Sequence, residues 1–265
     1  MTRRLGALLA AAALATLAGC PSGDVDPPSD VLTDPGAVIE LATRDVAGLR
    51  TLAVEARATQ YSDAQVIKGK LAILVSRPAS VHFSGLSPTD DVVSVLATDG
   101  DRFTSFERGG KVCYTGRACP TNVGRLVPIA MEPEQLASVL FGRPPVIAHA
   151  GETVTWDRGA GAYRLELEGQ DGVTQRLWVT HGRGEVKRAQ LVKDGKVQVD
   201  LAYDDFGDEG GFRLPHRLDV KMKKGDVDLR LVYRDVDVNL ELDAGAFRIP
   251  CPEGIRVEEL PCPEE

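Results

Sequence analysis

Residues 66–107 read VIKGKLAILVSRPASVHFSGLSPTDDVVSVLATDGDRFTSFE. Within this stretch, short runs rich in Val, Leu, Ile, Phe and Thr are separated by turn residues, among them Pro88 and the pair Asp99-Gly100. Alternating apolar and polar residues indicate β-strands, because successive side chains of a strand point to opposite faces of the sheet. An Asp-Gly pair between two such runs is typical of a tight antiparallel hairpin. The stretch therefore predicts a meander of antiparallel strands.

The same period of two recurs on both sides of this stretch and continues almost to the C-terminus. Asp171-Gly172, Asp194-Gly195 and the run Lys224-Gly225-Asp226 supply further tight connections. We predict strands at 52–59, 66–76, 80–85, 92–98, 103–107, 111–114, 162–168, 174–180, 185–192, 197–203, 216–223 and 226–235. The fold class is therefore mainly β with a few helices.

Two segments have the spacing of amphipathic helices instead. The first begins at Asp34-Pro35, which suit an N-cap and a first helical turn, and its apolar positions reach Leu49. The second is Pro133–Phe141, which Gly142 ends. Its apolar stripe comprises Leu136, Val139 and Leu140. The second helix is therefore predicted to interrupt the series of strands.

The N-terminus has the parts of a bacterial lipoprotein signal. Arg3 and Arg4 form a basic region, an apolar run from Leu5 to Thr16 follows, and residues 17–20 read LAGC. The run is too short to span a bilayer, which needs about 20 apolar residues. We expect cleavage before Cys20 and lipidation of Cys20, with palmitate among its acyl chains. The alternative is an ordinary secretory signal with a chance cysteine.

The mature chain is expected to contain a tether followed by one domain. Residues 20–35 are rich in Pro, Ser, Asp and Gly, so they bury too little apolar surface to offset the entropy of ordering and predict a disordered tether. No second linker interrupts residues 36–265, which favours a single domain. Pro21 occupies the position after Cys20 where an aspartate retains many lipoproteins at the inner membrane. We therefore expect anchoring at the periplasmic face of the outer membrane rather than at the inner membrane.

The charge of the chain excludes some classes of partner. Cleavage before Cys20 removes two of the 31 basic side chains and leaves 29 against 39 acidic ones, a net charge of about −10. Such a balance argues against nucleic acid and against binding to anionic lipid headgroups.

Four further cysteines, an even number, suit a compartment in which disulfides persist. They are Cys113, Cys119, Cys251 and Cys262, and they allow three pairings. We favour the local pairing of Cys113 with Cys119 and of Cys251 with Cys262. A zinc site is the alternative, but the CxxC spacing and neighbouring histidines are missing.

Motifs for catalysis are missing from the sequence. It contains no GxSxG elbow, HExxH, P-loop or GxGxxG after a strand. The four histidines, His82, His149, His181 and His216, are far apart. An acidic loop, Asp204, Asp205, Asp208 and Glu209, could hold calcium but lacks the EF-hand spacing, so we interpret it as a solvated hairpin loop. We expect no enzyme, no cofactor and no metal.

Three segments, in order along the chain, resemble the LolA/LolB family of lipoprotein carriers. The first has Arg77-Pro78, Pro88 and the strand that ends at Asp99-Gly100. The second, residues 212–215, reads FRLP before a strand. The third contains Phe247, Ile249, Pro250, Pro252, Gly254, Ile255 and Val257, like the family's closing pattern of Phe, Pro, Gly and Val/Ile. The chain departs from the family at His82-Phe83, where a tryptophan is frequent, and in its four extra cysteines.

The resemblance implies an antiparallel sheet of about eleven strands, curled into an incomplete barrel and capped by short helices. It implies a lid over an apolar concavity, with Arg77 holding the lid to the sheet through helix carbonyls. We expect the apolar face of the lid to comprise Leu136, Val139, Leu140 and Phe141. Leu86 is expected in a loop that assists delivery to the membrane.

Two functions follow as hypotheses. The first is a carrier or chaperone that binds a lipid or the acyl chains of lipoproteins, with a periplasmic donor protein as a further partner. It predicts an apolar cavity large enough for a ligand. The second is a scaffold or sensor lipoprotein that binds a protein partner through an edge strand, and it predicts a filled interior.

Overall fold

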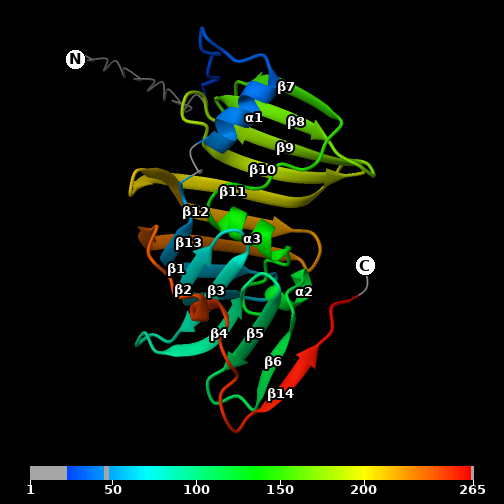
Figure 1. Ribbon diagram of the computed structural model, residues 1–265. Coiled ribbons are helices and arrows are strands. Elements are labelled where there is room, and N and C mark those ends of the chain that lie inside the picture. The colour runs from blue at the N-terminus through cyan, green and yellow to red at the C-terminus, as the bar shows by residue number, and fades with distance from the viewer. Residues whose placement is uncertain (1–22, 45–47, 264–265) are drawn as a thin grey trace, which may run out of the picture.

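The computed structural model describes residues 23–44 and 48–263, and the signal sequence and Cys20 lie outside these residues. The described chain forms one 14-stranded sheet in the order β14-β6-β5-β4-β3-β2-β1-β13-β12-β11-β10-β9-β8-β7 (Figure 1). The strands are β1 (Thr51–Tyr61), β2 (Val66–Ser76), β3 (Ser80–Leu86), β4 (Val92–Thr98), β5 (Arg102–Glu107), β6 (Val112–Arg117), β7 (Gly151–Asp157), β8 (Ala162–Glu168), β9 (Val173–Val179), β10 (Val186–Lys193), β11 (Lys196–Glu209), β12 (Phe212–Met222), β13 (Val227–Val238) and β14 (Arg256–Leu260). Neighbouring strands are antiparallel except β14, which is parallel to β6.

The mainly β fold class and the open, curled sheet are confirmed, but the number of strands is 14 rather than about eleven. Two strands were missed by the sequence pattern, β7 and β14. Both lie at an edge of the sheet and are largely exposed, so neither needs the alternating apolar residues that reveal a half-buried strand.

The strand order divides the sheet into two meanders. β1 to β6 run from the centre to one side, and β7 to β13 return from the far edge to the centre. The two meanders meet where β1 pairs with β13, from Leu52 opposite Val238 to Tyr61 opposite Asp228. We call this pairing the seam. It is antiparallel and joins residues that are 167 to 186 positions apart.

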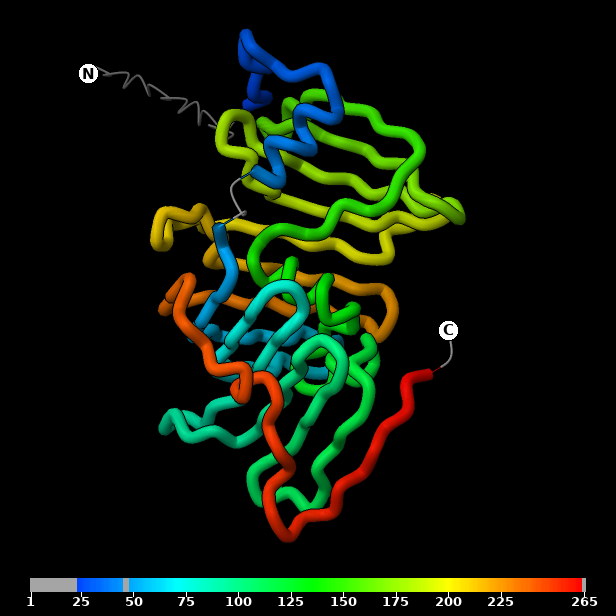
Figure 2. Tube along the Cα trace, in the orientation of Figure 1, coloured from blue at the N-terminus to red at the C-terminus, as the bar shows by residue number. Residues whose placement is uncertain are grey.

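The helices lie on one face of the curled sheet, which we call the inner face (Figure 2). α1 (Pro35–Thr43) packs on β7 and β8, and the Asp34 carboxylate caps it by accepting from Ala37 N at 3.2 Å. α2 (Pro120–Val123) is one turn, and α3 (Pro133–Leu140) packs on β2 and β3. The two predicted helices are thus present, although α1 is shorter than the apolar positions up to Leu49 suggested.

Part of the segment for which we expected a disordered tether contacts the sheet. Val25 N donates to Arg158 O at 2.8 Å, and Leu32 N donates to the Tyr163 hydroxyl at 3.0 Å. Val31 and Leu32 pack against the core, so the few apolar residues of this polar segment suffice to hold it. For residues 20–22, which lie outside the described residues, the tether stays a prediction.

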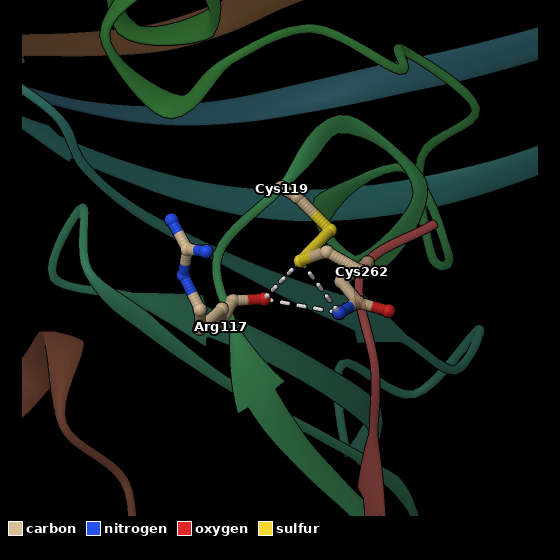
Figure 3. The surroundings of a disulfide bond; sticks show 4 residues. Arg117, Cys119 and Cys262 are labelled. Carbon is tan, nitrogen blue, oxygen red and sulfur yellow. Dashed lines mark hydrogen bonds between the residues drawn. A yellow bond between two sulfur atoms is a disulfide. The ribbon is translucent and has the colours of Figure 1, made fainter. Parts of the chain in front are cut away.

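The favoured disulfide pairing is wrong. Cys113 is bonded to Cys251 across 138 residues, and Cys119 is bonded to Cys262 across 143 residues. Figure 3 shows the second of these bridges. The reason is topological, because β14 returns to pair beside β6 and brings the last cysteines against the first two. Both bridges therefore attach the C-terminal segment to one edge of the sheet.

Candidate functional site

The inner face of the sheet carries the main hydrophobic core. Inward side chains of β1 to β3 and of β8 to β13 form one cluster with α1 and α3. The predicted lid residues Leu136, Val139, Leu140 and Phe141 are all at most 1% exposed. The structure therefore places these four residues of α3 and its C-cap together in the core. Their role in binding a ligand stays a proposal.

Arg77 lies at the end of α3, as the lid hypothesis requires. Its guanidinium carbon is 4.8 Å from the centre of the Phe141 ring, the C-cap of α3, so a cation–π contact joins the β2–β3 turn to the helix. Among the described residues its Nε is buried without a hydrogen-bond partner, and burial lowers the pKa of the guanidinium from its usual value. The helix contact is thus to an aromatic ring rather than to the expected helix carbonyls.

An apolar cavity of about 170 Å³ lies between α3 and the inner face of β9 to β12. Ala189, Leu201 and Met222 line it from the sheet, and Val139 lines it from α3. Pro144, Pro145 and Ile147 close it from the side opposite the sheet. Because its lining is largely aliphatic, the cavity suits hydrocarbon without a fixed hydrogen-bonding pattern.

Residues 143–148, which we call the strap, lie between α3 and β7 in the chain (Figure 2), and three of them line this cavity. Gln175, on β9, is 3% exposed and binds the strap with both ends of its amide. Its Nε2 donates to Pro145 O at 2.8 Å, and its Oε1 accepts from Ile147 N at 3.0 Å. The proline nitrogens carry no hydrogen to donate, so the strap needs few hydrogen bonds to be satisfied. One side chain therefore fixes the middle of the strap.

Gln175 is a polar residue between two apolar ones on the inner face of the sheet. Its register partners on the neighbouring strands β8 and β10 are Leu167 and Leu191. Sequence reasoning missed both Gln175 and the strap. The signals that could have found them are the Pro144-Pro145 pair after the predicted helix and a lone amide at an inward position of a strand.

Two buried tyrosines lie beside this region on the inner face. The Tyr233 hydroxyl donates to Leu140 O at 3.1 Å and so ties α3 to β13. The Tyr203 hydroxyl, on β11, has no hydrogen-bond partner among the described residues. Burial raises the pKa of both phenols above their usual value, so both stay neutral.

Leu86 is the last residue of β3 and is half-buried rather than exposed at a loop tip. It lies opposite Lys70 of β2 and Val92 of β4. Apolar exposure at this end of the sheet comes from the neighbouring hairpins, where Val66, Ile67 and Val92 are 53%, 51% and 43% exposed. The β3–β4 hairpin and the start of β2 therefore carry exposed apolar side chains at the ends of these interior strands. We call this region, with Leu86, Val66, Ile67 and Val92, the apolar edge.

The prediction of a solvated hairpin loop for the acidic residues 204–209 is wrong, because they form the end of β11 and make ion pairs with β12. Asp204 pairs with Arg217, Asp208 with Arg213, and Glu209 with His216.

In the described part of the chain no group of His, Cys, Asp and Glu is arranged to hold a metal ion. Within the same residues, no helix is both long and apolar enough to cross a membrane.

No protein-family model matches the sequence, and no curated protein matches it. Solved structures do match in shape. A LolA superfamily protein from Nitrosomonas europaea has a TM-score of 0.53 at 16% identity, over 82% of this chain and 98% of its own. This chain has a LolA/LolB-like fold.

Two further structures agree with the LolA/LolB-like fold. An outer membrane lipoprotein-sorting protein domain from Vibrio parahaemolyticus has a TM-score of 0.56 at 12% identity, over 81% of this chain and 97% of its own. A DUF1329 family protein from Desulfovibrio piger has a TM-score of 0.59 at 13% identity, over 81% and 98%. At these identities the likeness describes the fold, whereas the activity has to be argued from the site.

Proposed function

We propose that the chain is a lipoprotein anchored through Cys20 at the periplasmic face of the outer membrane. In this proposal it binds a lipid or the acyl chains of lipoproteins on the inner face of its half-barrel, without catalysis. The observation that carries the proposal is the apolar cavity beneath the strap. The fold it shares with a lipoprotein-sorting protein domain supports it.

The size of the cavity requires the strap to move when a ligand binds. About 170 Å³ is below the roughly 300–1,000 Å³ of most ligand pockets. Transfer of an acyl chain of about 14 methylenes out of water gains about 11 kcal/mol. Release of the two hydrogen bonds from Gln175 costs about 1 kcal/mol each. Burial of the acyl chain therefore exceeds the cost of releasing these two hydrogen bonds several-fold.

Native mass spectrometry with lipid extraction tests the proposal directly. The mature chain, produced in a periplasm with both disulfides formed, is expected to carry an acylated species at near-stoichiometric occupancy. A protein that carries no lipid and takes up no fluorescent long-chain fatty acid would contradict the proposal.

That negative result would favour the scaffold function, in which a protein partner pairs with an edge strand such as β14. One observation supports this second candidate: α1 and α3 already fill most of the inner face, with Leu136, Val139 and Leu140 at most 1% exposed. A filled interior is what a scaffold predicts.

The apolar edge formed by the β3–β4 hairpin and the start of β2 is the proposed site of contact with a membrane. Replacing the half-buried Leu86 by glutamate is expected to weaken binding of the lipid-loaded protein to vesicles and to slow transfer several-fold, because a carboxylate resists transfer into the bilayer. Vesicle flotation and transfer of a fluorescent fatty acid measure the two effects. Leu240→Glu, which puts the same charge at a leucine outside this edge, is the control. Unchanged flotation and transfer in Leu86→Glu would exclude this role.

A further inference from the structure

The segment before α1 is docked on the β7–β8 hairpin by backbone hydrogen bonds. Val25 both donates to Arg158 O at 2.8 Å and accepts from Trp156 Nε1 at 2.9 Å. Gly161, in the turn of the hairpin, gives Val25 its place, since a Cβ there would lie 3.2 Å from a Val25 methyl group. Val25 is thus bound on two sides.

A second point of attachment lies closer to α1. Tyr163 is fully buried, and its hydroxyl accepts from Leu32 N at 3.0 Å while it bonds to His181 Nδ1 at 2.9 Å. The other nitrogen of the His181 ring, Nε2, is 3.3 Å from Asp30. Tyr163 also meets Trp156 edge-on, with 5.3 Å between ring centres, so the two points of attachment belong to one cluster.

The acidic side chains of the segment face basic groups at both points. Asp24 and Asp26 flank Arg158, and Asp30 meets His181. These pairs are largely exposed and contribute little singly. Together with the backbone bonds they select one orientation of the segment along the hairpin.

We infer that residues 24–33 form a latch that fixes the orientation of the domain on its membrane. The inference rests on the proposed lipidation of Cys20. Only residues 21–23 separate Cys20 from Asp24, so the docked β7–β8 hairpin lies within about 14 Å of the lipid anchor. The β7 edge of the sheet therefore faces the anchoring membrane.

Docking then holds the apolar edge away from that membrane. β3 and β7 are nine positions apart in the sheet, which is about 43 Å along it, and Figure 1 shows β7 at the top of the molecule and β3 well below it, beside α3. Release of residues 24–33 adds up to roughly 35 Å of chain, enough for the domain to turn over. The latch thus decides whether the apolar edge can reach the bilayer that holds the anchor.

The test uses the lipidated full-length mature protein in supported bilayers, with the lipid on Cys20 verified by mass spectrometry. The release variant is Asp26→Asn, Asp30→Asn and Trp156→Phe, which removes two carboxylates and the indole donor to Val25. The control is Asp63→Asn, Asp194→Asn and Trp178→Phe, with the same charge change and the loss of the Trp178 donor to Asp157. Neutron reflectometry measures the height of the protein layer, and hydrogen exchange measures the Val25 and Leu32 amides.

Both amides are expected to be protected in the wild type and to exchange about tenfold faster in the release variant. The protein layer of the release variant is expected to be lower than that of the wild type and of the control. Unprotected amides in the wild type, or an equal layer height in the release variant, would overturn the inference. A missing lipid on Cys20 would overturn the anchoring itself, whereas failure to bind fatty acid would affect only the carrier function.

Discussion

Replacing all four bridging cysteines by alanine is expected to lower the free energy of unfolding by about 8 kcal/mol. In the chain-entropy model, a bridge across about 140 residues contributes about 5 kcal/mol. The second bridge then closes a smaller ring of about 17 residues, six from Cys113 to Cys119 and eleven from Cys251 to Cys262, for about 3 kcal/mol. Because whole domains are stable by about 5–15 kcal/mol, this loss removes at least about half of the stability.

The loss of either bridge alone is expected to be much smaller, because the remaining bridge still closes the long loop. Cys113→Ala with Cys251→Ala, and Cys119→Ala with Cys262→Ala, should each lose about 3 kcal/mol. Urea titrations followed by circular dichroism measure all three variants, and each double variant is the control for the other. A quadruple variant no less stable than the double variants would show that the bridges do not act by closing the long loop.

Ala189→Leu is expected to weaken fatty acid binding at least tenfold while leaving the fold intact. Ala189 is 3% exposed, lies opposite Leu177 and Leu201 in register, and lines the cavity beneath the strap. The leucine fills space that an acyl chain needs, and each methylene kept out of an apolar site costs about 0.8 kcal/mol. Because Ala189 lines the cavity, the larger side chain can extend into that space with little overpacking.

Titration with a fluorescent long-chain fatty acid measures the affinity, and thermal unfolding measures the stability. Ala202→Leu is the matched control, since Ala202 is the neighbour of Leu201 on β11 and lines a groove on the outer face with Arg188 and Asp219. Equal affinities in a folded Ala189→Leu would place the ligand outside this cavity.

The sequence predicted those parts of the fold that depend on local pattern. Period two, the Asp-Gly turns, the Asp34 cap and the Pro133–Phe141 stripe each reflect interactions within a few residues, and each is present. The resemblance to LolA/LolB carriers supplied the open, curled sheet. The shape of the sheet could not be predicted from the periodicity of the sequence. It depends on the order of the strands, which is decided by contacts between segments that are distant in the chain.

The errors concern features that depend on those distant contacts. The disulfides join cysteines in and just after β6 to cysteines on either side of β14, about 140 residues later, so local spacing of the cysteines was misleading. Gln175 can be recognised as a site residue only once its hydrogen bonds to the strap are known, and the strap is about 30 residues away in the chain. Residues 24–32 look unable to fold alone, yet the β7–β8 hairpin supplies the partners that their own composition lacks.

The seam between β1 and β13 has a consequence for how this chain is made. Each meander contains contacts between strands that follow one another, so each can begin to form while the ribosome is still at work. The seam can close only after β13 has been synthesised, and β14 can join β6 only later still. Until then the hydrogen-bonding edge of β1 stays open, and a chaperone that covers it would protect the newly made chain from pairing with its neighbours.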